Sequence, residues 1–295
     1  MDFKNWYEIK LKKIEEYLET YLPCCENRQK KIYESMRYSL NAGGKRIRPI
    51  LMMAVFEIFR SYDEDSIMPF ACALEMIHTY SLIHDDLPAM DDDDYRRGKL
   101  TNHKVYGEAM AILAGDGLLN KSVETVLQNR SLTGLSPEVI LRCLEILMAS
   151  SGTEGMIGGQ VVDMFVEERS LEYLEYMHRL KTGALIRAAC QIGATAGGAS
   201  EEETYKITQY SDYLGLAFQI KDDILDVTAQ ESDLGKPTGS DEKNDKLTYV
   251  ALLGLKESES LLQRYTGQAI ESIKYLGDKS QRLVEIAEYL LERKK

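Results

Sequence analysis

The residues best suited to chemistry lie in segment 78–97, HTYSLIHDDLPAMDDDDYRR. Six aspartates fall within ten positions and two arginines follow them (Asp85, Asp86, Asp91, Asp92, Asp93, Asp94, Arg96, Arg97). Ionised carboxylates repel one another at this density unless water or cations compensate their charge. Oxygen ligands without cysteine favour a hard cation, Mg²⁺ before Zn²⁺. Taken alone, the run is also typical of a solvated acidic loop.

A second acidic group, DDILD, occupies 222–226 at the end of an apolar helical pattern over 201–227. Asp222 and Asp226 are one helical turn apart and therefore share a face. Carboxylates inside an apolar helix are difficult to explain as solvated surface, because burying an uncompensated charge is costly. The recurrence of the pattern therefore favours two cation-binding groups over a single acidic loop.

Basic residues follow a glycine pair in AGGKRIRPI at 42–50. Lys45, Arg46 and Arg48 supply positive charge there, and Pro49 is typical of a helix start. Cations at a helix N-terminus can bind an anion by side-chain charge and by the helix dipole. The segment predicts an anion site, although basic loops are more often only solvated.

Two further segments carry polar groups. The step Lys181–Thr182 interrupts an apolar pattern, which favours a cavity wall because burying unpaired polar groups in dry core is costly. Segment 228–249 is rich in Gly, Lys, Asp and Ser, and we expect a mobile lid bearing Lys236, Lys243 and Lys246. Of these, Lys243 is expected at the surface.

The elements that must position these groups are predicted to be helices. Apolar residues recur at helical spacing over 2–22, 27–41, 49–59, 66–84, 103–130, 137–151, 171–197, 201–227 and 249–293. Four glycines in 152–168 indicate a close backbone approach or a kink. No strand-like alternation of useful length is present. We therefore expect an all-α fold, one large helical bundle domain over 1–295 with a cavity between its helices.

Composition excludes several classes. The formal net charge of −12 argues against nucleic acid as a partner, because phosphate backbones require basic patches. Five cysteines, an odd number, form neither a disulfide framework nor a zinc spacing. The first helix is charged and amphipathic rather than a signal sequence, and no apolar run reaches membrane-spanning length. We expect a soluble, cytoplasmic protein without a membrane span.

These motifs together resemble the short-chain trans-isoprenyl diphosphate synthases, most closely the bacterial farnesyl-type enzymes. The resemblance covers about 40–250 and rests on DDLPAMD (85–91) with RRG (96–98), DDILD (222–226), GGKRIRP, KTGALI, AFQ and GKPTGSD. It implies an isoprenyl synthase fold and a homodimer. It also implies Mg²⁺-dependent, head-to-tail condensation of isopentenyl diphosphate with dimethylallyl and then geranyl diphosphate, through an allylic cation, giving farnesyl diphosphate.

The resemblance also implies roles for individual residues. Three Mg²⁺ ions per active site would bridge the allylic diphosphate. The first motif would hold two of them through Asp85, Asp86 and Asp91. Asp222 would hold the third, supported by Asp223 and Asp226. Arg96, Lys181 and Lys236 would contact the same diphosphate. Isopentenyl diphosphate would be bound by four residues: Lys45, Arg48, His78 and Arg97. Thr182 and Gln219 would lie near the developing cation.

Product length is expected to depend on Tyr80, five residues before Asp85 and roughly 7.5 Å deeper along the helix at the helical rise. In the resembling family an aromatic residue at this place stops growth at fifteen carbons. Ser81, beside it, is too small to block the growing tail. The alternative is that Tyr80 is only a packed core aromatic with a satisfied hydroxyl. A geranylgeranyl diphosphate synthase is the matching alternative for the activity.

Other classes share part of the pattern. A terpene cyclase has the fold and the first motif but no use for an isopentenyl site, so GGKRIR and DDILD count against it. An HD-type phosphohydrolase is suggested by His84–Asp85, yet the chain offers few further histidines for its metal site (His78, His103, His178). A non-catalytic helical subunit would be expected to lack one aspartate motif, and both are intact here.

Overall fold

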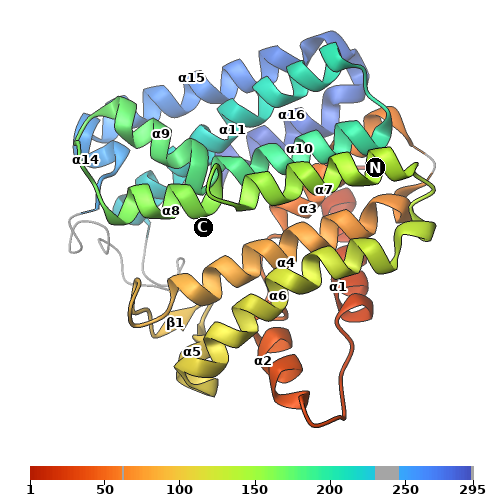
Figure 1. Ribbon diagram of the computed structural model, residues 1–295. Coiled ribbons are helices and arrows are strands. Elements are labelled where there is room, and N and C mark those ends of the chain that lie inside the picture. The colour runs from red at the N-terminus through yellow and green to blue at the C-terminus, as the bar shows by residue number, and fades with distance from the viewer. Residues whose placement is uncertain (62, 230–245, 294–295) are drawn as a thin grey trace. The chain divides into compact units, whose positions relative to one another are not determined.

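The computed structural model describes residues 1–61, 63–229 and 246–293, and these are almost entirely helical (Figure 1). The α-helices are α1 (Phe3–Tyr21), α2 (Lys30–Leu40), α3 (Ile47–Phe59), α4 (Met68–Asp85), α5 (Asn102–Tyr106), α6 (Glu108–Gln128), α7 (Pro137–Ser151), α8 (Met156–Met164), α9 (Leu171–Lys181), α10 (Gly183–Gly197), α11 (Glu201–Thr228), α14 (Tyr249–Leu253), α15 (Leu255–Ile273) and α16 (Gln281–Glu292). Short 3₁₀ helices are η1 (Glu64–Ile67), η2 (Arg130–Leu132) and η3 (Lys274–Ser280). The all-α prediction is confirmed.

The chain forms two compact units. Unit 1 comprises Met1–Met53 and Asp63–Ile140, and unit 2 comprises Ala54–Tyr62 and Leu141–Lys295. Each unit is described by itself below. The single domain over 1–295 stays a prediction.

Unit 1 is organised around α4, which packs lengthwise on α6 and also contacts α1 (Figure 1). Every residue from Met68 to Ile77 is buried, and Pro69 opens the helix where its missing N–H costs nothing. Stretch Glu64–Asp85 is long and apolar enough to cross a membrane by length and composition, contrary to the expectation from sequence. Its apolar window is 83% buried inside the protein, however, which is typical of a core helix.

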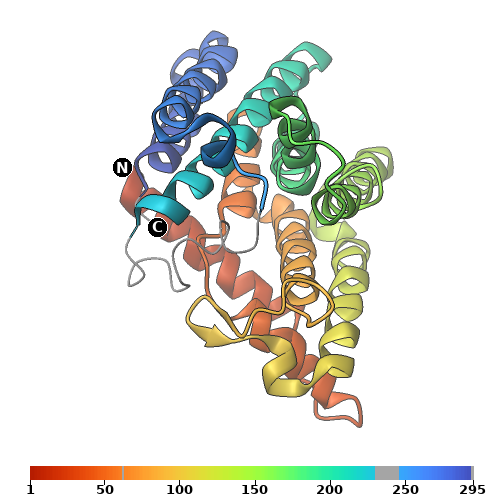
Figure 2. The same cartoon turned by 90° about the vertical axis from the view of Figure 1, so that its left-hand side faces the viewer.

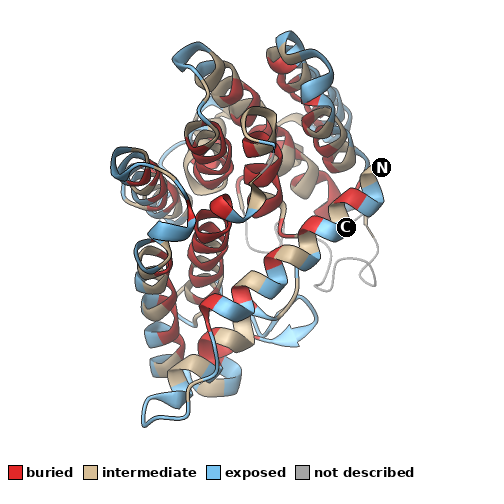
Figure 3. Ribbon diagram, turned by 90° about the vertical axis from the view of Figure 1, so that its right-hand side faces the viewer, coloured by how far each residue is buried: buried red, intermediate tan, exposed pale blue. Residues whose placement is uncertain are grey.

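Helix α1 shows why amphipathic spacing positions an element. Its buried residues recur every three or four positions (Trp6, Lys10, Ile14, Leu18, Tyr21), which is one face of an α-helix. Figure 3 shows this face as red segments that alternate with tan and blue along the helix starting at the N-terminus. The predicted helix 2–22 is thus confirmed, and Asp2 caps its first turn by accepting from the backbone N of Asn5.

Two predicted helices are interrupted. The predicted helix 103–130 is two helices, α5 and α6, because Gly107 adopts φ +85° between them. The predicted helix 171–197 ends at Lys181 and restarts at Gly183 after Thr182. The stretch 249–293 is helical as predicted, with breaks at Gly254, φ +78°, and within η3. The apolar spacing continues across each break, so periodicity alone does not reveal where one helix ends and the next begins.

A small hairpin was also missed. Strands β1 (Tyr95–Arg96) and β2 (Lys99–Leu100) pair antiparallel in the loop that follows α4 (Figure 2). The connecting residues Arg97 and Gly98 have φ of +53° and +74°, as a two-residue hairpin turn with two positive φ angles requires. Strands of two residues are too short to show alternation, so the sequence carried no strand signal.

In unit 2, α11 lies along α10 and α15, and its apolar side chains form one core cluster with residues of α9, α14 and α15. Helix α8 approaches the end of α9 very closely. A Cβ on Gly159 would lie 2.1 Å from the backbone N of Lys181, a distance that side-chain atoms do not tolerate. The glycine-rich segment therefore makes the close backbone approach that its composition indicated.

A similar close approach in unit 1 is testable. A Cβ on Gly115 of α6 would lie 2.0 Å from Nε2 of His84, which hydrogen-bonds the carbonyl of Ile112 at 3.1 Å. Gly115→Ala should displace the imidazole and lower the free energy of unfolding by about 1–3 kcal/mol. Gly267→Ala is the matched control: it is also helical but has open space around it, so it should raise stability by about 0.5–1 kcal/mol. Urea denaturation measures both, and equal effects would contradict this role of Gly115.

Candidate functional site

The first acidic motif lies at the C-terminal end of α4. Asp85 is the last helical residue and Asp86 is the C-cap. The following loop folds back, so that the backbone N of Asp91 donates to the carbonyl of Asp85 at 2.9 Å. Asp85 is half-buried and Asp91 is exposed. The loop thereby brings the backbone of Asp91 onto the helix end that carries Asp85.

Asp86 is buried and bonded to an arginine. It accepts from Nε of Arg96 at 2.7 Å and lies 2.6 Å from its Nη2. Burial raises the pKa of Asp86, and Arg96 opposes that rise. Two residues for which the resemblance implies contacts with metal and with diphosphate therefore neutralise each other in the structure. Among the other acids of the run, Asp93 and Asp94 are exposed and pair with Arg96 and Lys104 at 3.6 and 2.6 Å.

The basic loop and the hairpin meet within unit 1. Arg97 of the hairpin turn donates to the carbonyl of Gly43, and a Cβ on Gly44 would lie 2.6 Å from the guanidinium carbon of Arg97. Lys45 and Arg48 are half-buried beside them along the chain. Burial first, and then Arg48, Arg97, Arg96 and Arg46, hold the pKa of His78 well below its ordinary value. The four residues expected at the isopentenyl site (Lys45, Arg48, His78, Arg97) thus share one cationic region.

Arg46 differs from its neighbours. Sequence analysis counted it among the charges of the anion loop, but it is 3% exposed and its Nη1 lies 2.7 Å from Oε1 of Glu75 on α4. Its charge is therefore compensated inside the protein. Glu75 lies within the predicted apolar helix 66–84, and nothing in its spacing indicated a partner.

Unit 2 contains a cavity of about 350 Å³. Carboxylates, lysines and neutral polar side chains form its wall together with a few apolar ones: Asp163, Met177, His178, Lys181, Thr182, Gln219, Asp222, Asp223, Leu225, Asp226, Lys246, Leu247 and Thr248. The structure therefore brings together the second aspartate motif, the Lys181–Thr182 step and Gln219. The expected lysine of the 230–245 segment, Lys236, lies outside the described residues, as does Lys243.

A chain of hydrogen bonds orders one wall of this cavity. The hydroxyl of Thr182 donates to Oε1 of Gln219 at 3.1 Å, and Nε2 of Gln219 donates to Oδ1 of Asp223 at 3.1 Å. The other oxygen of Asp223 accepts from the backbone N of Tyr249 at 2.8 Å. Asp223 is 3% exposed. Its carboxylate therefore serves the protein's own donors, and it fixes the amide orientation of Gln219.

Ion pairs hold two other groups of the cavity wall. Nζ of Lys181 lies 2.6 Å from Oδ2 of Asp163 on α8. Oδ1 of Asp222 lies 2.7 Å from Nη2 of Arg293, whose guanidinium stacks on the ring of Phe218 at 4.1 Å. Sequence reasoning missed Asp163 and Arg293. A lysine in an apolar helix indicates an acidic partner elsewhere in the chain, but nothing in the sequence indicates that this partner lies on α8.

A divalent cation fits the donors present. Within the described ranges, no three His, Cys, Asp or Glu side chains lie close enough together to hold an ion alone. Mg²⁺ does not need such a cage, because it takes one or two carboxylates and completes its shell with water and phosphate oxygens. Asp222 and Asp226 line the same cavity wall one turn apart, which meets that requirement with oxygen ligands only.

Tyr80 lies one turn before His84 on α4, and its ring meets the imidazole edge-on with centroids 5.7 Å apart. The side chain is 5% exposed, and its hydroxyl is buried without a hydrogen-bond partner in the part of the chain that the structure describes. Burial and Asp85 raise the pKa of Tyr80 to about 12. Ser81 donates to the carbonyl of His78 at 2.9 Å. Tyr80 thus differs from a core tyrosine with a satisfied hydroxyl.

His178 predicts a pH dependence of stability. Burial lowers its pKa from 6.5 to about 3, and its ring stacks on Tyr249 with centroids 5.5 Å apart. The unfolded chain takes up this proton near pH 6.5 but the folded chain does not, so stability should fall as pH falls through this window. The loss should reach about 2 kcal/mol between pH 7 and pH 5. Urea unfolding of His178→Phe should lack this contribution, and an identical pH slope in variant and wild type would contradict it.

Comparisons with known proteins bear on the whole chain. The family model described as polyprenyl synthetase matches residues 29–283. The farnesyl diphosphate synthase of Geobacillus stearothermophilus is 50% identical over 236 residues, 79% of this chain and 78% of that protein. That of Bacillus subtilis is 47% identical over 262 residues, 88% of each chain. The geranylgeranyl diphosphate synthase of Cyanophora paradoxa is 46% identical over 265 residues, 89% of this chain and 87% of that protein.

A solved structure agrees with these relatives. The geranyltransferase of Helicobacter pylori, crystallised with magnesium and isoprenyl diphosphate, is 32% identical and superposes with a TM-score of 0.85 over 99% of this chain and 97% of that chain. The family match spans most of the sequence and the relatives are similar over most of both lengths. The chain therefore belongs to the polyprenyl synthetase family of prenyltransferases.

Proposed function

We propose that this chain condenses isopentenyl diphosphate head-to-tail with dimethylallyl and then geranyl diphosphate, and that farnesyl diphosphate is its main product. The observation that carries the proposal is the cavity of about 350 Å³ in unit 2, whose wall combines Asp222 and Asp226 with Lys181. Acidic and basic groups on one wall suit a substrate that binds through metal ions and directly through its phosphate oxygens. The names of the relatives support the same reaction.

The chemistry starts with departure of diphosphate from the allylic substrate. When bound, Mg²⁺ supplies positive charge that stabilises the leaving diphosphate. We propose three ions, two held by Asp85, Asp86 and Asp91 of the first motif and one held by Asp222. Lys181, on the same cavity wall as Asp222, adds a fixed cation for diphosphate oxygens, and Arg96 does so at the first motif. Asp223 and Asp226 have supporting roles, which fits the use of both oxygens of Asp223 by protein donors.

Two neutral groups are proposed to face the allylic cation. The hydroxyl of Thr182 donates a hydrogen bond to Oε1 of Gln219, so the lone pairs of its oxygen are directed away from that bond and can meet positive charge. Preorganised dipoles of this kind stabilise charge as it develops without reorganising at the moment of reaction. The double bond of isopentenyl diphosphate then attacks the cation, and loss of a proton completes the condensation.

Isopentenyl diphosphate is proposed to bind in unit 1 at Lys45, Arg48, His78 and Arg97. The support is the contact of Arg97 with the carbonyl of Gly43 in the basic loop, together with the arginines that, after burial, lower the pKa of His78. A second diphosphate without its own metal requires such charge, because a phosphate group is held best by charge-assisted hydrogen bonds.

We further propose that the protein is a cytoplasmic homodimer. Helix α6 exposes large apolar side chains, among them Ile112 at 46% and Leu113 at 51%, and exposed apolar groups on one helix are typical of a protein interface. All five cysteines are free thiols, which fits a reducing compartment.

The reaction itself is tested by incubating purified protein with isopentenyl and dimethylallyl diphosphates. Chromatography should detect farnesyl diphosphate with Mg²⁺, none with EDTA, and a return of product when Mg²⁺ is restored. Asp222→Asn should lower turnover at least about a hundredfold. Asp278→Asn, an exposed aspartate of η3 outside the cavity wall, is the control and should be fully active. Near-normal turnover of Asp222→Asn would refute the role of the second motif.

Product length is tested at Tyr80. Removing its ring should open the path toward Met76 and Ile77, a turn lower and fully buried, so Tyr80→Ala should make mainly the twenty-carbon geranylgeranyl product. The change should also cost stability, about 3–5 kcal/mol by analogy with aromatic-to-alanine core changes. Tyr80→Phe keeps the ring and loses only the unpartnered hydroxyl, so its product should stay farnesyl diphosphate. An unchanged product from Tyr80→Ala, or a geranylgeranyl product from the wild type, would place the limit elsewhere.

A further inference from the structure

The buried pair Arg46–Glu75 has no part in the proposed reaction, yet it is among the least exposed ion pairs of unit 1. Nη1 of Arg46 lies 2.7 Å from Oε1 of Glu75, and the two side chains are 1% and 2% exposed. A buried pair is weak evidence for stability, because its desolvation cost offsets its attraction and apolar replacements are often neutral. The pair therefore calls for an explanation other than stability.

The backbone at Arg46 gives the first indication. Its φ is +48°, a left-handed conformation that residues other than glycine adopt at a cost. Gly43 and Gly44, at +85° and +127°, carry the preceding part of the same turn. Such strain persists only where the surroundings over-determine the conformation. The turn delivers Lys45 and Arg48 on either side of Arg46.

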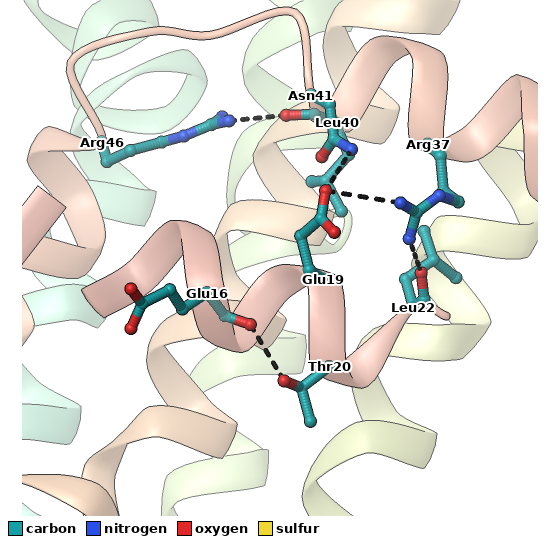
Figure 4. A network of polar contacts seen from close by, with 8 residues as sticks. All are labelled: Glu16, Glu19, Thr20, Leu22, Arg37, Leu40, Asn41 and Arg46. Atoms are coloured by element: carbon teal, nitrogen blue, oxygen red, sulfur yellow. Dashed lines mark hydrogen bonds and ion pairs between the residues drawn. The ribbon is translucent and has the colours of Figure 1, made fainter. Parts of the chain in front are cut away.

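The surroundings do fix this turn at its base. Nη2 of Arg46 donates to the carbonyl of Leu40, the last residue of α2, at 2.6 Å. Asn41, next along the chain, donates to Glu19 of α1 at 3.1 Å, and Arg37 pairs with the same carboxylate at 3.3 Å. Figure 4 shows this arrangement, with Arg46 reaching across the open loop to the end of α2. One guanidinium thus ties the turn to α2 and, through Glu75, to α4.

Charge gives the second indication. Besides burial, four nearby arginines lower the pKa of His78, as cations close to an imidazole do: Arg46, Arg48, Arg96 and Arg97. Desolvation followed by Arg46 and Arg96 lowers the pKa of Arg97, whereas Glu75 opposes that shift. Glu75 and Asp86 are therefore the buried counter-charges of this arginine-rich region, Glu75 paired with Arg46 and Asp86 with Arg96. Glu75 neutralises Arg46, the buried member of the basic loop.

We propose that Arg46 and Glu75 are positioning residues of the isopentenyl diphosphate site: the pair holds the strained turn 43–46 so that Lys45 and Arg48 meet the diphosphate, and neither member touches substrate. The inference rests on the proposed function, since it names the site that the pair serves. Of the three cations of the basic loop, Arg46 is then a structural anchor and does not bind the diphosphate.

The test replaces the pair as a unit. Arg46→Met together with Glu75→Met removes both buried charges at similar volume, so the double variant should fold with little change in unfolding midpoint. Its dissociation constant for isopentenyl diphosphate, measured by calorimetry, should rise about tenfold. KM for isopentenyl diphosphate should rise in parallel, while KM for dimethylallyl diphosphate and the rate at saturation stay unchanged.

A second, less buried ion pair of unit 1 serves as the control. Nζ of Lys10 and Oε1 of Glu64 also lie 2.7 Å apart, their side chains are 5% and 33% exposed, and Glu64 also lies 3.2 Å from Nζ of Lys13. Lys10→Met with Glu64→Met should leave binding of isopentenyl diphosphate and both KM values unchanged. A comparable loss of affinity in this control would overturn the inference, because the effect would not be specific to the turn.

Three outcomes decide the inference. Wild-type affinity for isopentenyl diphosphate in the folded double variant would make the pair merely structural, and equal losses for both substrates would mean general loosening. If the double variant does not fold, Arg46→Lys is measured instead. Lysine keeps the charge without the planar fork of the guanidinium. Arg46→Lys should therefore weaken the binding of isopentenyl diphosphate but not that of dimethylallyl diphosphate, and unchanged binding would overturn the inference.

Wild-type protein that binds isopentenyl diphosphate but forms no product would refute the proposed function and leave the binding comparison valid.

Discussion

The cost of burying charge is the constraint on which this structure depends. Each unit places ionised groups beside apolar helices and gives several of them an opposite charge within bonding distance: Asp86 with Arg96, Arg46 with Glu75, Lys181 with Asp163 and Asp222 with Arg293. Partners are necessary because an isolated ion in a low-dielectric interior would shift its pKa and lose its charge. The helices can therefore present ionised side chains at their ends and walls without a bound ligand to balance them.

Much of the fold was accessible from periodicity. The apolar run that ends at Asp85 predicted a core helix bearing the first motif, and the run over 201–227 did the same for Asp222. Both predictions hold, because an apolar helix of this length is stable only when it is buried in a core, as α4 is on all sides over Met68–Ile77. The breaks at Gly107 and Thr182 were not predicted, because a break changes φ and ψ at one residue while the apolar pattern continues on both sides. Boundaries of this kind are set by tertiary packing rather than by local composition.

The residue types of the site were also accessible, but their partners were not. Sequence proximity linked Lys45, Arg46 and Arg48 as three equivalent cations, and only the burial of Arg46 and its pair with Glu75 show that one of them faces inward. Asp163 and Arg293 pair with residues 18 and 71 positions away, and such pairings depend on how helices pack. Glu75 carried no signal because one acid in a buried helix is compatible with several partners. A single sequence therefore predicts which chemistry is present better than which atoms meet.

The contact between Gly159 and Lys181 has a mechanical consequence. Because the backbone of α8 rests directly on the backbone at the end of α9, no side chain lies between them that could change rotamer and absorb a displacement. Close-packed contacts of this kind transmit strain rather than dissipate it. A pull on the ammonium of Lys181 is thus transferred to α8 through two routes, the ion pair with Asp163 and the backbone contact itself. Helix α8 exposes Ile157, Val161 and Met164, so this apolar surface belongs to an element that rests directly on the end of α9.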